Sequence, residues 1–372
     1  MQNNRQTRFP LGEQVRLEAL SQNPYPVLQT LQEQEPVSWL SEQGLWFVTR
    51  RADMLAILLD SAAFTVSSPD SLLEETLGVT MLSTDGPTQR RLRQPFNAFF
   101  APARVQAQMT EPIEAQVRAL IDQFSAAGHI DLKTAFADRL ALWTVTTMLG
   151  IPIHDFAMFR GWFTDIAAAL GNFTHDPATR QRGLAAAAAF GDYAAGHLER
   201  LRQSPDDSVL SNLVRAAEPL SDEELISAAR VIIFGGLETT AALLANTIWA
   251  LLTHPAAFAA VQRQPSLLQQ AVEESLRWEP PVQSCTRHVT RAVEVQGIEL
   301  APGDTVQCMV GAANRDPAHF AHPDVFDLRR ERAGEHLSFA IGKHFCLGAA
   351  LARLEGVVGL RVLFERLPGL RL

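Results

Sequence analysis

Cysteine and lysine are scarce in this chain of 372 residues. The chain has 3 cysteines, which are too few for a disulfide framework at this length, and their odd number is typical of a reducing compartment. Only two lysines occur, Lys133 and Lys343, so arginine supplies nearly all of the positive charge. The small, odd number of cysteines leads us to expect a cytoplasmic protein.

An excess of basic residues is also lacking. The chain has 32 basic and 41 acidic residues, and the net charge of -9 is spread along it, so nucleic acid is not an expected partner. The first twenty residues contain charges and no apolar core, and no uncharged apolar run approaches the roughly 18 residues that a membrane helix requires. We expect a soluble monomer without a membrane association.

Apolar residues at every third or fourth position predict long helices at 103–125, 135–149, 183–202, 222–253, 265–278 and 346–365. Strand patterns are short. "VSWL" and "LWFVTR" predict a hairpin around Glu42 to Gly44, and a smaller β region is expected at "TRHVTRAVEVQGIEL". No repeat or Gly/Ser linker divides the chain. The predicted fold class is mainly α with small β regions, in a single domain spanning 1–372.

The stretch "SFAIGKHFCLG" places Cys346 just before an amphipathic run. Leu347, Leu351 and Leu354 recur at helical spacing after it, which predicts that Cys346 lies at a helix start, where unpaired N–H groups favour a thiolate. Gly342 and Gly348 remove side chains on either side of the cysteine, which lets a flat ligand approach the backbone and allows the tight turn. From these residues alone, a buried free cysteine remains the alternative.

The run F-x-x-G-x-H-x-C-x-G resembles the haem-binding signature of the cytochrome P450 family. It is formed by Phe339, Gly342, His344, Cys346 and Gly348. The resemblance implies a cytochrome P450 fold in which Cys346 is the axial thiolate ligand of the iron of haem b, and thiolate donation favours O–O cleavage. Cys285 and Cys308 lack the glycines and the following helix, and are interpreted as core packing.

A second motif, "EESLRWEPPV", contains Glu274 and Arg277 three residues apart on one helix face, where they can form an ion pair. It resembles the E-x-x-R pair of the family, completed by Arg330 from "DVFDLRR". The implied role is a buried network that fixes the loop leading to Cys346. The alternative is a solvated surface pair worth at most about 1 kcal/mol.

A third motif lies within "VIIFGGLETTAALL". Gly235 and Gly236 cost a helix about 1 kcal/mol each relative to alanine, so a groove is expected there. The Thr239 hydroxyl can reach the Gly235 carbonyl, and Glu238 has no evident partner. The set resembles the family's oxygen-binding motif, which implies that Thr239 holds a proton-donating water and that Glu238 helps to supply it. The alternative is a core helix weakened by glycine.

A fourth, weaker match is "TDGPTQRRLRQPFNAFF". It resembles the family's helix whose histidine and arginine hold a haem propionate, but Gln89 replaces the histidine and Arg93 is retained. Gln89 can still donate a hydrogen bond. The resemblance assigns Arg287 in "CTRHV" and His344 to the remaining propionate contacts, as charge-assisted donors.

The resemblance places the substrate pocket at 61–84, 165–182, Val231 to Gly235 and Val282 to Ser284. These segments are mainly apolar, so a lipophilic small molecule is the expected substrate. The two least regular stretches, 68–88 and 170–183, are candidates for loops over the site. The chain stops at "LPGLRL" without the β hairpin that usually follows the last helix in the family, so we expect a more open distal site.

No flavin or iron-sulfur motif is present, so electrons must come from another protein. A basic face formed by Arg90, Arg91, Lys343 and Arg353 is predicted to dock an acidic ferredoxin. The leading hypothesis is a monooxygenase that inserts one atom of O2 into the substrate by hydroxylation or epoxidation. The alternatives are an enzyme that uses peroxide or rearranges an oxygenated substrate, and a haem-thiolate ligand sensor.

Overall fold

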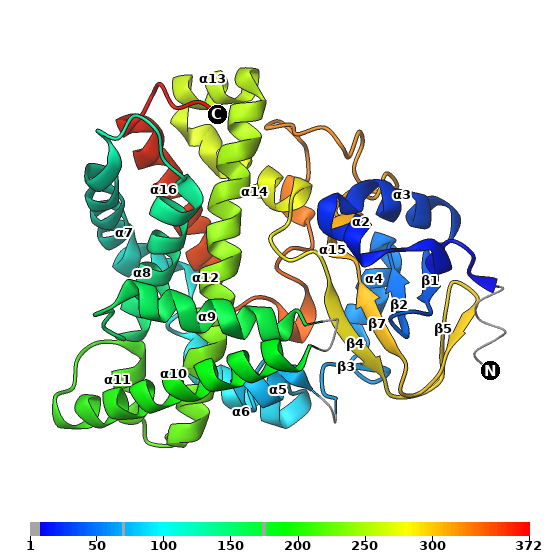
Figure 1. Cartoon of the computed structure of the whole chain (residues 1–372), viewed down its shortest axis with the longest axis horizontal. Coiled ribbons are helices and arrows are strands. Elements are labelled where there is room, and N and C mark those ends of the chain that lie inside the picture. The colour runs from blue at the N-terminus through cyan, green and yellow to red at the C-terminus, as the bar shows by residue number, and fades with distance from the viewer. Residues whose placement is uncertain (1–7, 69–70, 173–175) are drawn as a thin grey trace. The chain divides into compact units, whose positions relative to one another are not determined.

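The computed structural model describes residues 8–68, 71–172 and 176–372 (Figure 1). The chain divides into two compact units. The first unit comprises residues 1–68 and 273–346, and the second comprises 69–272 and 347–372. Each unit is therefore built from two separate stretches of sequence. The single domain stays a prediction.

The second unit consists of helices. They are α5 (Leu72–Leu77), α6 (Gly86–Asn97), α7 (Pro102–Phe124), the π-helix η2 (Lys133–Ala137), α8 (Asp138–Leu149), α9 (Phe156–Leu170), α10 (Pro177–Gln203), α11 (Val209–Val214), α12 (Asp222–Thr253), α13 (Pro255–Arg263), the short η3 (Pro265–Leu267), the start of α14 (Leu268–Trp278) and α16 (Ala349–Arg366). All six predicted helices are confirmed, and α12 has the predicted bounds. Of the two irregular stretches, 68–88 contains α5 and the start of α6, while 69–70 and 173–175 lie outside the described residues.

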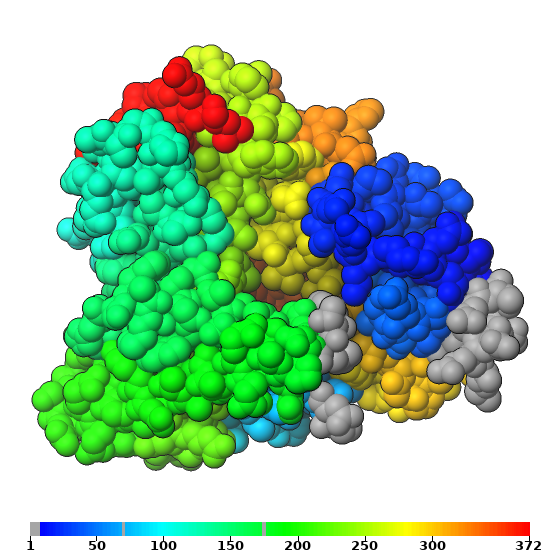
Figure 2. Space-filling view, viewed as in Figure 1, coloured from blue at the N-terminus to red at the C-terminus, as the bar shows by residue number. Residues whose placement is uncertain are grey.

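Helix α12 begins with a capping box, in which Ser221 accepts a hydrogen bond from the Glu224 backbone and the Glu224 carboxylate accepts one from the Ser221 backbone. Helices α9 and α10 lie side by side (Figure 1), and both belong to the green part of the surface in Figure 2. Phe163 of α9 and Phe190 of α10 join them, with ring centroids 5.3 Å apart in an edge-to-face arrangement. Aromatic packing thus holds these two helices together.

Helix α12 is also long and apolar enough to cross a membrane, by length and composition alone. Half of its most apolar window is buried inside the protein, and Glu238 lies within the helix. A core helix meets the same criterion, so this finding is weak evidence for a membrane span. The expectation concerned uncharged apolar runs, and Arg230 and Glu238 interrupt the apolar sequence of α12.

The first unit contains a five-stranded sheet in the order β1-β2-β7-β4-β3. Its strands are β1 (Val37–Leu40), β2 (Leu45–Val48), β3 (Phe64–Thr65), β4 (Cys285–Val289) and β7 (Thr305–Cys308), and β5 (Val293–Val295) pairs with β6 (Ile298–Leu300) in a separate hairpin. The predicted β1–β2 hairpin is confirmed. Strand β7 was not predicted. It pairs in parallel with β2, placing Val48 opposite Cys308.

Helices cover the sheet on both faces. The helices that the first unit contributes before and after the strands include η1 (Gly12–Gln14), α2 (Leu17–Gln22), α3 (Pro24–Gln34), α4 (Arg51–Leu59) and α15 (Val310–Ala313). The side chains of β2 alternate between the faces, because successive strand residues point in opposite directions. Trp46 packs in a cluster with Met54 of α4, and Phe47 packs in another with Leu31 of α3. At β2 the sheet is thus packed between α4 on one face and α3 on the other.

Candidate functional site

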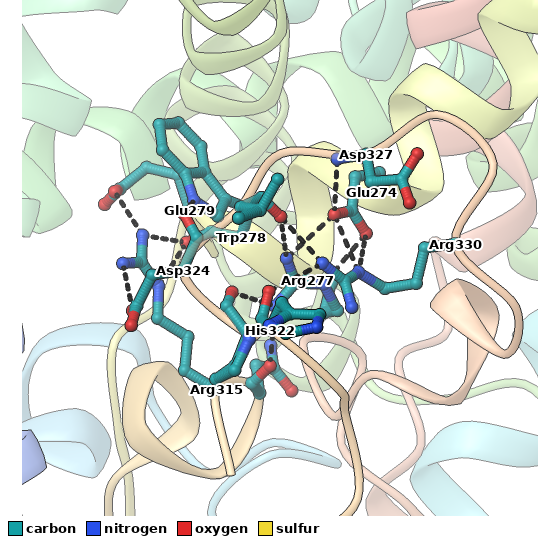
Figure 3. A network of polar contacts seen from close by, with 12 residues as sticks. Glu274, Arg277, Trp278, Glu279, Arg315, His322, Asp324, Asp327 and Arg330 are labelled. Atoms are coloured by element: carbon teal, nitrogen blue, oxygen red, sulfur yellow. Dashed lines mark hydrogen bonds and ion pairs between the residues drawn. The ribbon is translucent and has the colours of Figure 1, made fainter. Parts of the chain in front are cut away.

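The predicted ion pair on α14 is the centre of a buried network in the first unit (Figure 3). The Glu274 carboxylate accepts hydrogen bonds from Nε and Nη2 of Arg277, both at 2.8 Å, and from Nε of Arg330 at 2.9 Å. The side chains of Glu274 and Arg277 are 1% and 0% exposed, which excludes the solvated surface pair. The Asp327 backbone N–H also donates to Glu274, at 3.0 Å.

Arg277 has more partners than its acid. Its guanidinium donates to the carbonyl oxygens of Asn314, Pro323 and Val325 at 3.0, 2.8 and 3.1 Å. Burial lowers the pKa of Arg277, and the hydrogen bond to Glu274 opposes that shift. With its N–H groups engaged, Arg277 joins α14 to the segment that follows α15.

Asn314 carries this network to the cysteine loop. Its Oδ1 accepts a hydrogen bond from the Leu337 backbone N–H at 2.7 Å, and its Nδ2 donates to Ser338 Oγ at 2.8 Å. Ser338 Oγ donates in turn to the Leu276 carbonyl on α14 at 2.6 Å. These contacts fix the first residues of the loop and bear out the structural role expected of the motif. No sequence motif pointed to Asn314.

The loop itself is closed by one backbone hydrogen bond, from the Cys346 N–H to the Phe339 carbonyl at 2.9 Å. Gly342 has φ +74°, in the left-handed region that favours glycine, and it begins the short helix η5 (Gly342–His344). A second short helix, η4 (Ala333–Glu335), lies upstream. The predicted tight turn is therefore present at Gly342. Cys346 is half-buried at the end of this loop.

Two expectations about Cys346 need correction. Helix α16 begins at Ala349, so the cysteine lies three residues before the first helical residue. Gly348 is the N-cap residue and has φ -83°, a conformation that does not require glycine. The side chains buried along α16 also include Glu355, so the buried surface is broader than the predicted apolar stripe.

Arg287 on β4 is buried, with 6% exposure. Its Nη1 donates to the carbonyl of its neighbour Thr286 at 2.7 Å, and the described part of the chain gives it no acidic partner. A buried guanidinium without a carboxylate is costly, which makes it a ready site for an anionic group. His344 is half-buried on η5 in the same unit.

The oxygen motif lies at the middle of α12 in the second unit. Thr239 Oγ1 donates to the Gly235 carbonyl, as predicted, and the helix continues unbroken through this point. A Cβ on Gly236 would lie 2.9 Å from Cγ2 of Val145 on α8, so that glycine serves close helix packing. A Cβ on Gly235 would meet no described atom within 4 Å beyond its own helix. Gly235 alone fits the predicted groove.

Glu238 has a partner, contrary to expectation. Its Oε1 accepts a hydrogen bond from Nη1 of Arg160 on α9 at 3.1 Å. Nε of Arg160 also donates to the buried carboxylate of Asp138 at 3.1 Å, and Lys133 pairs with the same Asp138. The Glu238 and Arg160 side chains are 32% and 26% exposed, so water reaches this network. No motif around Arg160 could have predicted it, because the pair joins two separate helices.

Gln89 and Arg93 lie one turn apart on α6, also in the second unit. Gln89 is buried, with 3% exposure, and Arg93 is half-buried. Their spacing puts them on the same helix face. Their contact with a propionate stays a prediction.

The predicted site residues are divided between the units. Cys346, Phe339, Gly342, His344 and Arg287 belong to the first, whereas Gly235, Gly236, Glu238, Thr239, Gln89, Arg93 and Gly348 belong to the second. Within the described ranges, no group of three or more His, Cys, Asp or Glu side chains could hold a metal ion. Cys346 therefore has no competing metal cluster among the described residues.

Comparisons with known proteins agree with these motifs. A family model described as "Cytochrome P450" matches residues 192–367. The cytochrome P450 monooxygenase PikC of Streptomyces venezuelae is 36% identical over 94% of this chain and 85% of its own length. The biotin biosynthesis cytochrome P450 of Bacillus subtilis is 32% identical over 94% and 90%.

The solved structures that match this chain are also those of cytochrome P450 proteins. The structure of P450BioI in complex with hexadec-9Z-enoic acid ligated acyl carrier protein matches with a TM-score of 0.89 and 30% identity, covering 95% of this chain and 94% of that one. The structure of CYP109E1 from Bacillus megaterium in complex with testosterone matches with a TM-score of 0.86 and 29% identity, covering 93% and 91%. The chain therefore belongs to the cytochrome P450 family of haem b-dependent monooxygenases.

Proposed function

We propose that Cys346 ligates the iron of haem b and that the protein inserts one oxygen atom from O2 into a lipophilic small molecule. The residues fit the group. Arg287 is a buried cation without a described acid, as a propionate contact requires, and Gly235 leaves open space beside the Thr239 hydroxyl. When bound, a thiolate-ligated haem supplies the capacity to cleave the O–O bond.

The chain's own residues then have separate tasks. The Glu274 network fixes the loop at Leu337 and Ser338, and the loop presents Cys346. Arg287 and His344 hold the propionates, with Gln89 and Arg93 as further predicted contacts. Phe339 and Gly342 shape the loop, while Gly348 caps α16. Each of these roles concerns binding and orientation.

Thr239 and Glu238 have the task of proton delivery, and their arrangement is the observation that carries the proposal. The Thr239 hydroxyl donates to the Gly235 carbonyl, which leaves its lone pairs to accept a hydrogen bond from water. Glu238 is the preceding residue of α12, and its carboxylate is held by Arg160 and is partly in contact with solvent. Such a pair favours an oxygenase over a peroxide-using enzyme or a ligand sensor, since only the oxygenase must bring protons to bound O2.

Thr239→Ala tests this assignment. We expect the variant to consume electrons with much less product formed per electron, because the water loses its anchor. Thr247→Ala is the matched control. Thr247 donates the same kind of hydrogen bond, to the Leu243 carbonyl two turns further along α12. If Thr239→Ala kept the wild-type ratio of product to electrons, proton delivery through Thr239 would be wrong.

The haem assignment is tested by spectroscopy. We expect a strongly red-shifted Soret band in the reduced carbon monoxide complex, and its loss in Cys346→Ala. A colourless protein after supply of hemin would contradict the proposal. Compounds that shift the resting spectrum then identify the substrate class. The carrier-bound acyl chain and the steroid of the related structures define two lipophilic groups to screen.

We also propose a cytoplasmic monomer that receives electrons from an acidic ferredoxin. One part of the predicted basic face changes: Arg91 pairs with the Glu224 carboxylate, so its charge is neutralised. Arg90 is exposed and has no ion pair among the described residues. Lys343 is also exposed, and its Nζ donates a hydrogen bond to Ser61 Oγ. We expect Arg90→Glu to slow reduction at low ionic strength, with Arg104→Glu as a control. Equal rates at all salt concentrations would exclude steering by Arg90.

A further inference from the structure

Two cysteines that the haem site does not use face each other across the sheet of the first unit. Cys285 on β4 is the direct partner of Cys308 on the antiparallel strand β7. Directly opposed residues share a face, and their Cα atoms lie roughly 4.5–5.5 Å apart. A disulfide needs a Cα separation of roughly 4.4–6.8 Å. The two backbones are therefore already placed for a bond between the sulfurs.

The side chains are placed for it as well. Each thiol lies close enough to the other to shift its pKa. Cys285 is half-buried, whereas Cys308 is 0% exposed. Arg287 lies two residues along β4 and hence on the same face as Cys285. The environment of the pair is thus asymmetric.

This asymmetry separates the reactivity of the two thiols. The neighbouring Cys308 lowers the pKa of Cys285, and burial opposes that shift. Cys285 in turn raises the pKa of Cys308, and burial adds to the rise. Cys285 is also the less buried of the two residues, so we assign it as the attacking thiol and Cys308 as the resolving thiol.

We propose that Cys285 and Cys308 form a site of reversible oxidation by hydrogen peroxide, at which the two thiols close to a disulfide between β4 and β7. The Cys285 thiolate attacks one peroxide oxygen, the O–O bond breaks, and a sulfenic acid and water form with uptake of one proton. The Cys308 sulfur then attacks the sulfenic sulfur. The S–S bond forms and a second water leaves with the Cys308 proton.

The balance is complete. Two thiols lose two electrons and one peroxide is reduced to two waters. A dithiol reductant restores the two thiols by thiol–disulfide exchange and is itself oxidised to a disulfide. Both cysteines pack in the apolar cluster that includes Leu337 and Ile341, at the start and middle of the Cys346 loop. The crosslink therefore joins the two strands against which that loop packs.

The test uses the full haem-loaded protein, reduced and then exposed to one equivalent of hydrogen peroxide. Free thiols are alkylated, and the digested peptides are identified by mass spectrometry. We expect the Cys285 and Cys308 peptides to lose alkylation in parallel and to appear as one disulfide-linked species, and dithiothreitol to restore both. Untreated protein is the control. A linkage to Cys346, or both peptides still alkylated after peroxide treatment, overturns the proposal.

Two variants separate the steps. In Cys308→Ser we expect a sulfenic acid at Cys285, trapped by dimedone, without any disulfide. In Cys285→Ser we expect neither product, because the remaining thiol is buried and protonated. If dimedone labelled Cys308 in Cys285→Ser as fast as it labels Cys285 in Cys308→Ser, the assignment of Cys285 as the attacking thiol would be wrong. If either variant fails to fold, the wild-type peptide map still decides whether the disulfide forms.

Discussion

The end of α14 in the first unit and the middle of α16 in the second each bury a glutamate, but they satisfy it in opposite ways. Glu274 is 1% exposed and accepts hydrogen bonds from Arg277 and Arg330. Glu355 is 2% exposed, and its Oε1 has no hydrogen-bond partner among the described residues. Burial raises the pKa of Glu355 to about 8, with only the Thr144 hydroxyl opposing the rise.

The difference shows two solutions to one problem. A buried carboxyl group must either be paired with cations or carry a proton. The first solution fixes two segments to each other, since Arg277 and Arg330 also hold carbonyl oxygens of the loop between Asn314 and Val325. The second leaves a carboxyl group that is neutral below its raised pKa of about 8 and becomes charged above it. The first is a structural crosslink, and the second is a titratable group within the helical core.

Removing a cation from the paired glutamate is the strongest way to break this comparison. We expect Arg277→Ala to lower the free energy of unfolding by about 3–5 kcal/mol, because Glu274 stays buried with one partner fewer. We also expect loss of bound haem, since Arg277 connects to the Cys346 loop through the Asn314 segment. Urea unfolding and the haem-to-protein absorbance ratio measure the two effects.

The matched control is Arg332→Ala. Arg332 pairs with Glu335 over the same three-residue separation, but its side chain is 56% exposed. We expect no measurable change in the unfolding midpoint or in haem content. Equal destabilisation by the two substitutions would contradict the importance of burial.

The second prediction removes the titration of the unpaired glutamate. The folded-state pKa of about 8 lies above the ordinary value of 4.5, so between these values the folded protein retains a proton that the unfolded chain has released. Stability therefore falls as pH rises through this window, by up to about 1.4 kcal/mol per pH unit, or about 3 kcal/mol between pH 5 and 7. We expect Glu355→Gln to remove this slope in urea unfolding at pH 5, 6 and 7.

Glu365→Gln serves as the control for that experiment. Glu365 is on the same helix, but its side chain is 44% exposed. We expect the wild-type pH slope to persist in this variant. A slope that is identical in wild type and in Glu355→Gln would show that Glu355 does not titrate in this window.

The smallest effect on stability is expected at the half-exposed glutamate. Glu238 and Arg160 are both reached by water, so Arg160→Ala should cost under about 1 kcal/mol in urea unfolding. Asp138 keeps Lys133 as its partner. We expect the main effect of Arg160→Ala to be a lower ratio of product to electrons, because Glu238 loses the group that orients it. If Arg160→Ala instead lowered the free energy of unfolding by several kcal/mol, this network would be a structural crosslink like that of Glu274.

The sequence predicted the site best where the signal is local. Glu274 and Arg277 stand three residues apart, and Thr239 stands four residues after Gly235, so helical geometry alone brings each pair together. The bounds of α12 followed from its long periodic pattern. The hairpin β1–β2 also followed from neighbouring residues.

The sequence failed where partners come from distant elements. The parallel pairing of β2 with β7, the Asn314 relay and the Arg160–Glu238 pair each join segments with no shared pattern. Helix α9 was missed although its apolar content is high, whereas α6, which is mostly polar, was expected only through the family resemblance. Glu355 was overlooked because a glutamate on a helix is usually exposed.

The parallel pairing of β2 with β7 has a consequence for synthesis on the ribosome. Val48 cannot meet Cys308 until about 260 further residues have been translated, which takes on the order of 13–50 s at roughly 5–20 residues per second. During that interval the nascent β1–β2 hairpin exposes an unpaired edge. A chaperone that shields this edge until the partner strand emerges would raise the yield of native protein.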